Sequence, residues 1–159
     1  MKNNTGKFLS FHIGILTICF FVVASYGQAV AELKEDVSEV RLEVKAPFST
    51  ATITIDGQGQ IDYIASSPDT GIDRLTDSGS IALDQYRELI DLINDNNYFA
   101  LEDKYIEEKL ADATSYIITV KKGYQTKSVV CYGTCPDQIW TIINKIKELW
   151  GKEILEVGG

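Results

Sequence analysis

Two cysteines, Cys131 and Cys135, are the reactive side chains that the sequence brings closest together. Three residues separate them, one of which is Gly133, so the pair can close into a disulfide if the two Cα atoms come within about 7 Å. Free thiols would instead favour redox chemistry, because backbone N–H groups at a helix N-terminus stabilise a thiolate. Redox enzymes of the thioredoxin type use two intervening residues, so the spacing favours a structural disulfide over a redox pair or unpaired thiols.

The remaining residue types exclude several familiar active sites. The single histidine, His12, lies near the N-terminus, and the third cysteine, Cys19, follows it closely. A domain without histidine has no Ser-His-Asp or Cys-His nucleophile, and two cysteines alone do not complete a zinc or iron–sulfur site. We therefore expect a protein that is not an enzyme, with no metal site and no cofactor.

Carboxylates give two weaker signals. Asp56 and Asp62 bracket a segment that resembles the start of a calcium loop, but Ile61 stands where such a loop needs glycine. A hairpin turn is the favoured interpretation there. An acidic group further along has the residue types for glycoside hydrolysis, although a solvated acidic face is the simpler interpretation. That group consists of Glu102, Asp103, Glu107, Glu108 and Asp112.

The N-terminal segment, residues 1–31, has the pattern of a secretory signal peptide. Its only charges are Lys2 and Lys7, an apolar run follows, and the segment ends in Ala29-Val30-Ala31. A basic start, an apolar middle and a small-x-small exit predict cleavage before Glu32.

An uncleaved membrane anchor is the alternative, because the uncharged stretch Phe8–Ala31 reaches the ~20 residues that span a hydrocarbon core. In either case residues 32–159 are expected to form a single domain outside the cytoplasm, secreted or tethered by its N-terminus.

The charge balance narrows the class of partner. The chain carries 23 acidic and 15 basic side chains, a net charge of −8. Nucleic-acid binding is disfavoured, because its affinity comes mainly from lysine and arginine replacing counterions on phosphate. A membrane would be contacted only through an uncleaved N-terminal segment, so the expected partner is an extracytoplasmic protein.

Strands dominate the first half of the domain. Apolar and polar residues alternate over Val40–Lys45, Ala51–Ile55 and Ile61–Ala65, and Asp56–Gly59 supplies a tight turn. The polar stretch that follows could hold one further edge strand around Ile72–Leu75.

Helices and a second hairpin fill the second half. Apolar residues spaced by three and four predict a helix over Leu83–Ile93, and Thr114–Lys122 with Thr126–Tyr132 predicts a hairpin. A second helix is predicted from Pro136, at the first helical position, to a left-handed cap at Gly151. This order, ββ(β)-α-ββ-α, predicts an α+β domain: an antiparallel sheet of two hairpins with two helices on one face.

The order of these segments resembles the exported bacterial and archaeal family called domain of unknown function 6438, over roughly Val40–Trp150. Many members carry a Cys-x-Gly-x-Cys-Pro motif where Ala46–Thr50 stands here, and a similar string occurs in this chain at Cys131–Pro136. The resemblance implies the fold and export, and it implies no activity. The segments that carry it are Ile53–Tyr63, Tyr86–Tyr105 and Ser115–Pro136.

Two aromatic residues are candidates for binding. Tyr124 is expected at the tip of the second hairpin, and Trp140 lies off the main apolar stripe of the last helix. The favoured hypothesis is therefore a non-catalytic exported domain that binds a partner. The alternative is an extracytoplasmic thiol–disulfide protein that uses Cys131 and Cys135.

Overall fold

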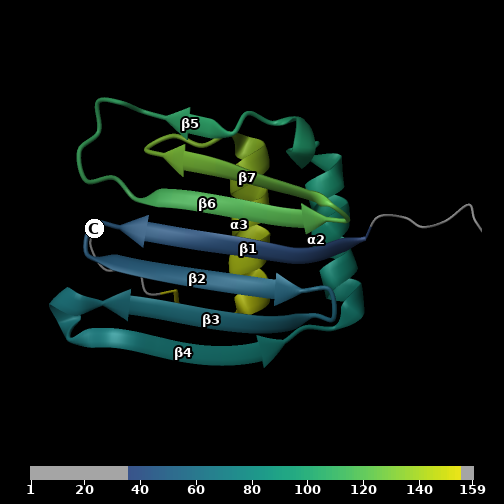
Figure 1. Cartoon of the computed structure of the whole chain (residues 1–159), viewed down its shortest axis with the longest axis horizontal. Coiled ribbons are helices and arrows are strands. Elements are labelled where there is room, and N and C mark those ends of the chain that lie inside the picture. Colours follow the sequence, from purple (N-terminus) through teal and green to yellow (C-terminus); the bar gives the residue numbers. More distant parts are fainter. Residues whose placement is uncertain (1–35, 155–159) are drawn as a thin grey trace, which may run out of the picture. The chain divides into compact units, whose positions relative to one another are not determined.

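The computed structural model describes residues 36–154, which fold into a mixed β-sheet and two α-helices (Figure 1). The strands are β1 (Val37–Ala46), β2 (Ser49–Asp56), β3 (Gln60–Ser67), β4 (Ile72–Ser80), β5 (Lys104–Ile106), β6 (Ser115–Lys122) and β7 (Gln125–Tyr132). The helices are α2 (Leu83–Asp95) and α3 (Asp137–Trp150), with short 3₁₀ turns η1 (Pro68–Thr70) and η2 (Tyr98–Ala100). The predicted signal peptide or anchor, and its cleavage site at Ala29, Ala31 and Glu32, lie outside the described residues.

The sheet confirms the α+β class and corrects its predicted layout. Its strand order is β4-β3-β2-β1-β6-β7-β5, so β1 to β4 form an antiparallel meander that joins the β6–β7 hairpin through β1. Strand β5 pairs with β7 in parallel, which makes the sheet mixed rather than antiparallel. The prediction missed β5 because a three-residue strand shows no alternation.

The edge strand β4 is longer than predicted. It runs from Ile72 to Ser80 and pairs with β3 along its whole length, from Ser67 opposite Ile72 to Gln60 opposite Ser80. Nearly all of its side chains are exposed, so its sequence needs no apolar alternation beyond Leu75.

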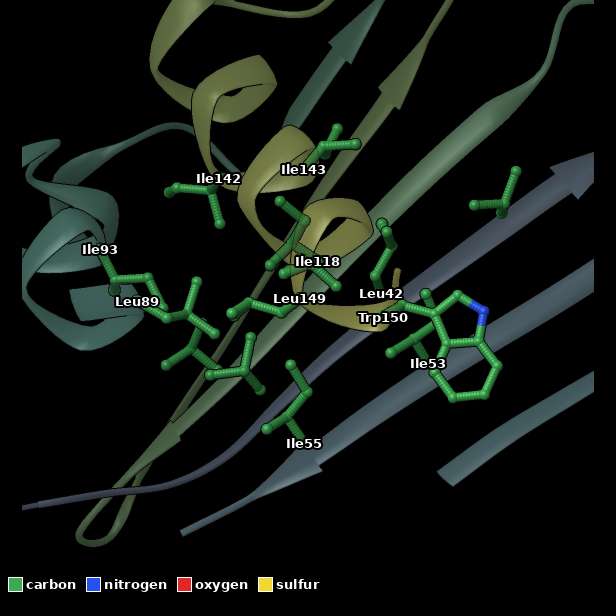
Figure 2. Packing of buried hydrophobic residues seen from close by; sticks show 14 of the residues in the cluster. Leu42, Ile53, Ile55, Leu89, Ile93, Ile118, Ile142, Ile143, Leu149 and Trp150 are labelled. Atoms are coloured by element: carbon green, nitrogen blue, oxygen red, sulfur yellow. The ribbon is translucent and has the colours of Figure 1, made fainter. Parts of the chain in front are cut away.

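Both helices cover the same face of the sheet (Figure 1). The core lies between this face and the helices. Figure 2 shows Leu42, Ile53 and Ile118 from the strands pointing toward Ile142 and Leu149 of α3. These positions repeat every second residue in the strands and every three or four in the helices, which is why the sequence pattern predicted them.

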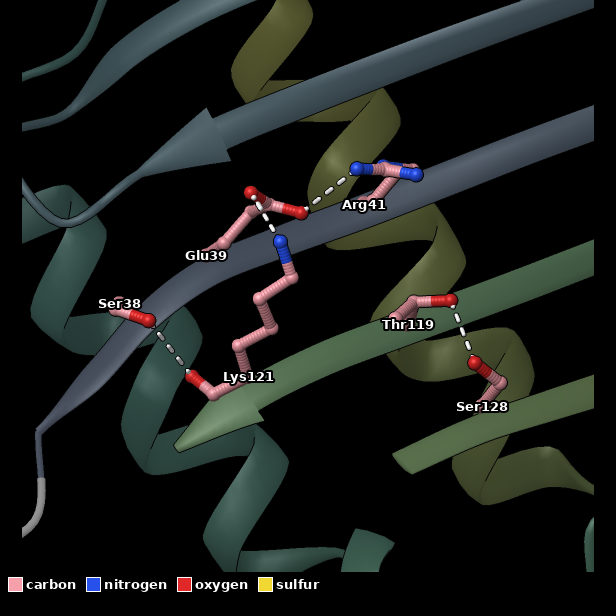
Figure 3. Close-up of polar contacts among 6 residues, drawn as sticks. All are labelled: Ser38, Glu39, Arg41, Thr119, Lys121 and Ser128. Carbon is pink, nitrogen blue, oxygen red and sulfur yellow. Dashed lines mark hydrogen bonds and ion pairs between the residues drawn. The ribbon is translucent and has the colours of Figure 1, made fainter. Parts of the chain in front are cut away.

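The opposite face of the sheet is polar and its charges pair with one another. The Glu39 carboxylate accepts hydrogen bonds from Arg41 (3.0 Å) and Lys121 (2.9 Å) (Figure 3). On the neighbouring strands, the hydroxyl oxygens of Thr119 and Ser128 lie 2.8 Å apart in a hydrogen bond. The hydrogen bond from Lys121 lowers the pKa of the Glu39 carboxyl below its usual value. Internal pairing of this kind leaves the central part of the face close to neutral.

The ends of α3 confirm one predicted cap and correct another. Gly151 has φ 64°, and its N–H donates to the Lys147 carbonyl, as the left-handed cap requires. Pro136 is the N-cap residue rather than the first helical residue, since its backbone is extended. Its carbonyl accepts the first helical hydrogen bonds, from the N–H groups of Ile139 and Trp140. Neither helix in residues 36–154 has the length and apolar character needed to cross a membrane.

Candidate functional site

A disulfide joins Cys131, near the end of β7, to Cys135, one residue before the N-cap of α3. Their Cα atoms are 5.2 Å apart, within the range that such a bond allows. Cys131 is buried in the core, whereas Cys135 is partly exposed. The bond fixes the turn that leads from the sheet into α3.

This disulfide turn also holds the connection between β5 and β6. The Tyr132 hydroxyl donates a hydrogen bond to the Leu110 carbonyl (3.0 Å). The oxygen of that hydroxyl accepts a hydrogen bond from the Ala113 N–H (3.3 Å). The Glu107 N–H donates to the Tyr132 carbonyl (2.9 Å). The segment from Glu107 to Thr114, which we call the clasp, is therefore attached to the turn at three points.

Gly133 is the residue that lets the clasp approach so closely. Its φ of 71° lies in the left-handed region that favours glycine. A Cβ atom at this position would lie 2.5 Å from Leu110 Cδ1, which is shorter than any real contact. The backbone conformation thus favours glycine here, and any larger residue would force the Leu110 side chain to move.

A pocket of about 250 Å³ lies between the clasp, the disulfide and the first turn of α3. Its lining contains no carboxylate, lysine or arginine, so it offers apolar and aromatic contact with a few hydroxyl groups. The lining residues are Leu110, Ala113, Thr114, Tyr116, Cys131, Gly133, Thr134, Cys135 and Trp140. We call this feature the disulfide pocket.

Trp140, one of the two predicted binding residues, forms part of the pocket wall. Its ring meets the Tyr116 ring edge to face, with centroids 5.0 Å apart, and Lys147 Nζ lies 5.2 Å from the Tyr116 centroid. Edge-to-face pairs hold both rings in fixed orientations. The structure therefore brings Trp140, Cys131 and Cys135 together in one concave site.

Tyr124, the other predicted binding residue, lies far along the strands from this pocket. The β6–β7 register pairs Lys122 with Gln125 at the tip and Ser115 with Tyr132 at the other end. Tyr124 lies at that tip and is fully exposed. It does not belong to the disulfide pocket.

Four carboxylates lie in the two segments that border the pocket, the clasp and the first turn of α3, and form no ion pairs among residues 36–154: Glu107, Glu108, Asp112 and Asp137. Lys109 is the basic residue among them in the clasp. A fifth acidic residue, Asp103, behaves differently because Lys127 Nζ donates to it, and that hydrogen bond lowers the pKa of the Asp103 carboxyl. The acidic group predicted from sequence is therefore exposed and divided: one member holds β5, and others border the pocket.

The remaining chemical candidates have structural partners. Asp56 Oδ1 accepts the N–H groups of Gln58 and Gln60, so this carboxylate holds the predicted hairpin turn. The buried Tyr98 hydroxyl donates to the Ile118 carbonyl (2.8 Å), and burial raises its pKa. Burial also raises the pKa of Tyr86 to about 12.

Sequence reasoning missed Leu110 and a second, shallower pocket. Leu110 is an exposed apolar residue in a segment rich in charged residues, a mild signal for a contact surface. The second pocket, of about 300 Å³, lies where the β1–β2 turn approaches η1, and its exposed Phe48 stands next to Pro47. An aromatic residue in a proline turn was the signal that could have indicated it.

Fold and site together define a small α+β domain with a disulfide-closed pocket at one corner of its sheet. The chain belongs to the family described as Domain of unknown function (DUF6438), whose model matches residues 47–150. The match runs from the turn before β2 to the last residue of α3 and so includes the whole disulfide pocket. None of the curated proteins matches the chain at a significant level.

Proposed function

We propose that this protein is a non-catalytic interaction domain that acts outside the cytoplasm and contacts a protein partner at the disulfide pocket. The composition of the pocket carries this proposal. Its walls combine Leu110, Trp140 and Tyr116 with a disulfide, and they include no carboxylate or amine to act as a general acid or base. Such a surface supplies apolar contact area, which is what binding at a small site requires.

Export is supported by two independent features. The disulfide between Cys131 and Cys135 is of the kind that persists in oxidising compartments. The signal-like segment 1–31 would deliver the domain to such a compartment.

The first test is the intact mass of the protein recovered from its native host and alkylated without prior reduction. We expect a mass that begins at Glu32 and carries no alkyl group on Cys131 or Cys135. A mass that retains residues 1–31 would indicate a tethered domain, still outside the cytoplasm. Alkyl groups on both cysteines would contradict an oxidised, exported domain.

The second test separates binding from catalysis at the cysteines. The oxidised protein is used to capture partners from the extracytoplasmic fraction of the host, before and after treatment with iodoacetamide. Binding through the pocket predicts the same partner in both samples, because a disulfide does not react with the reagent. Capture that is lost after alkylation would contradict the proposal.

Thiol–disulfide exchange is the second candidate, and the partial exposure of Cys135 beside the first turn of α3 favours it. It predicts that Cys135→Ser abolishes function in the host, whereas an interaction domain would tolerate this change so long as the protein folds. Measuring the host phenotype and the folded fraction of the same variant distinguishes the two.

A further inference from the structure

The charges around the disulfide pocket differ from those at the centre of the sheet's polar face. Glu107, Glu108 and Asp112 lie in the clasp, and Asp137 lies in the first turn of α3. None of the four is in an ion pair within residues 36–154, and two lysines accompany them: Lys109 in the clasp and Lys147, whose Nζ lies 5.2 Å from the ring centroid of the pocket residue Tyr116. The pocket therefore has an apolar interior, and the segments that border it, which we call its rim, carry four carboxylates against two lysines.

The polar face of the sheet provides the contrast. There Glu39 forms ion pairs with both Arg41 and Lys121 (Figure 3). Lys45 Nζ pairs with Glu43 Oε2 at 3.0 Å. A partner that approaches this face meets charges that are already neutralised. A partner that approaches the pocket meets four carboxylates against two lysines, so electrostatic complementarity favours a cationic partner.

The size of the pocket limits what enters it. Sites for whole small molecules usually measure about 300–1,000 Å³. The disulfide pocket, at about 250 Å³, falls below that range, which favours a single side chain over a cofactor or metabolite. Apolar walls exclude a charged side chain, because its charge would be left unpaired.

From these observations we propose that the disulfide pocket binds a peptide segment of the partner protein that inserts one uncharged apolar side chain and carries lysine or arginine on either side of it. This inference rests on the proposed interaction function and specifies the chemistry of the partner. The apolar side chain would contact Leu110 and Trp140, and the flanking cations would lie over the rim carboxylates.

The test is a titration of the ¹⁵N-labelled, oxidised protein with two synthetic peptides, followed by NMR. The first peptide is acetyl-Lys-Leu-Lys-amide, and the second, acetyl-Glu-Leu-Glu-amide, has the same apolar residue with reversed charge. We expect saturable shifts of the Trp140 indole N–H and the Thr134 amide with the cationic peptide, with a Kd of about 1 mM. The anionic peptide should bind at least about tenfold more weakly.

Charge-removing variants locate the effect. Glu108→Gln combined with Asp112→Asn removes two rim charges, and asparagine suits position 112, where φ is 61°. This variant should weaken binding of the cationic peptide about tenfold and make binding less sensitive to salt. The matched control, Asp69→Asn with Asp73→Asn, removes two exposed charges from η1 and β4, and it should leave the Kd unchanged.

Other outcomes overturn the proposal. Equal binding of the two peptides would show that charge does not select the partner. Shifts confined to the β6–β7 tip would place the contact elsewhere, and no shift at about 10 mM peptide, ten times the expected Kd, would show that the pocket takes no such side chain. Any of these results, combined with successful capture of a partner by the oxidised protein, would leave the interaction function standing and reject this occupant alone.

Discussion

The two ends of the β6–β7 hairpin present their aromatic residues in opposite ways. At the tip, Gly123 has φ 55° and Tyr124 is fully exposed, with nothing folded against it. At the other end, Trp140 is partly buried in a pocket whose wall is fixed by the Cys131–Cys135 disulfide. Figure 1 shows the tip at the right end of the strands and the β5–β6 connection at the left end.

This difference shows that an exposed aromatic side chain does not by itself form a concave binding site. An exposed tyrosine at a turn offers area without a defined geometry, so any partner must itself order the ring. The disulfide end is preorganised: Tyr132 holds the clasp, Gly133 lets Leu110 approach, and the disulfide fixes the turn. If this account is correct, changes at the disulfide end should affect stability and binding, whereas changes at the tip should affect neither.

The largest effect is expected from Gly133→Ala. Alanine would hold the left-handed backbone conformation at a cost of about 1–2 kcal/mol, and its Cβ would displace Leu110 and crowd Glu107 Cβ, which adds about 1 kcal/mol. Gly71→Ala is the matched control, because Gly71 has a similar φ of 75° and open space around it. Urea unfolding should show a loss about twice as large for Gly133→Ala. Equal losses would mean that the clasp does not pack against the turn as described.

Removing the disulfide should have the next largest effect. Cys131→Ala combined with Cys135→Ala should lower the free energy of unfolding by ~2 kcal/mol, since the closed loop is short. Hydrogen exchange should speed up in residues 107–114 and remain unchanged in residues 122–126, because only the clasp depends on the turn. Equal acceleration at both ends of the hairpin would contradict a local role for the bond.

A smaller effect is expected from Tyr132→Phe. The change removes the hydroxyl that bonds Leu110 and Ala113, and it should cost about 1 kcal/mol. Tyr124→Phe removes the same atom from the exposed tip and should change stability by less than about 0.5 kcal/mol. Thermal unfolding of the two variants side by side measures the difference in stability. If Tyr124→Phe lowers stability as much as Tyr132→Phe, the two ends of the hairpin do not differ as described.

The smallest effect concerns the ion pair that fastens β5 beside β7. The hydrogen bond from Lys127 lowers the pKa of the Asp103 carboxyl below its ordinary value. The pair therefore stabilises the fold above that ordinary pKa, and the contribution is lost as pH falls through the lowered pKa. An NMR titration of the Asp103 carboxyl should find this low pKa, and Lys127→Met should restore the ordinary value. A pKa that Lys127→Met does not change would mean that the pair does not form in solution.

Much of the fold was predictable because the spacing of apolar residues in a long amphipathic helix or strand indicates which side is buried. The strands around Leu42 and Ile53 and the helix carrying Ile142 follow the periods of two and 3.6 that a one-sided core imposes. Strand β5 and the second half of β4 were missed, because a three-residue strand and an exposed edge carry no such pattern. Pairing with β7 and β3 creates these strands, and pairing is a property of the folded sheet.

The site was predictable in its chemistry and less so in its geometry. Cys131, Cys135 and Trp140 were identified from spacing and residue type, and the structure places them around one pocket. Leu110 was missed because its role depends on Tyr132 and Gly133, which contact it across a gap of more than twenty residues in the chain. Tyr124 shows the converse, since an aromatic residue at a turn predicts exposure and says nothing about a surrounding site.

The most direct test of the central claim replaces one exposed apolar residue at each end of the hairpin by aspartate. Leu110→Asp puts a charge in the wall of the disulfide pocket, and Tyr124→Asp puts the same charge at the tip. Both positions are exposed, so both variants should fold, which circular dichroism can verify. We expect capture of the extracytoplasmic partner to fall at least about tenfold with Leu110→Asp and to be unchanged with Tyr124→Asp. Unchanged capture by Leu110→Asp with loss in Tyr124→Asp would place the functional surface at the tip and contradict the account.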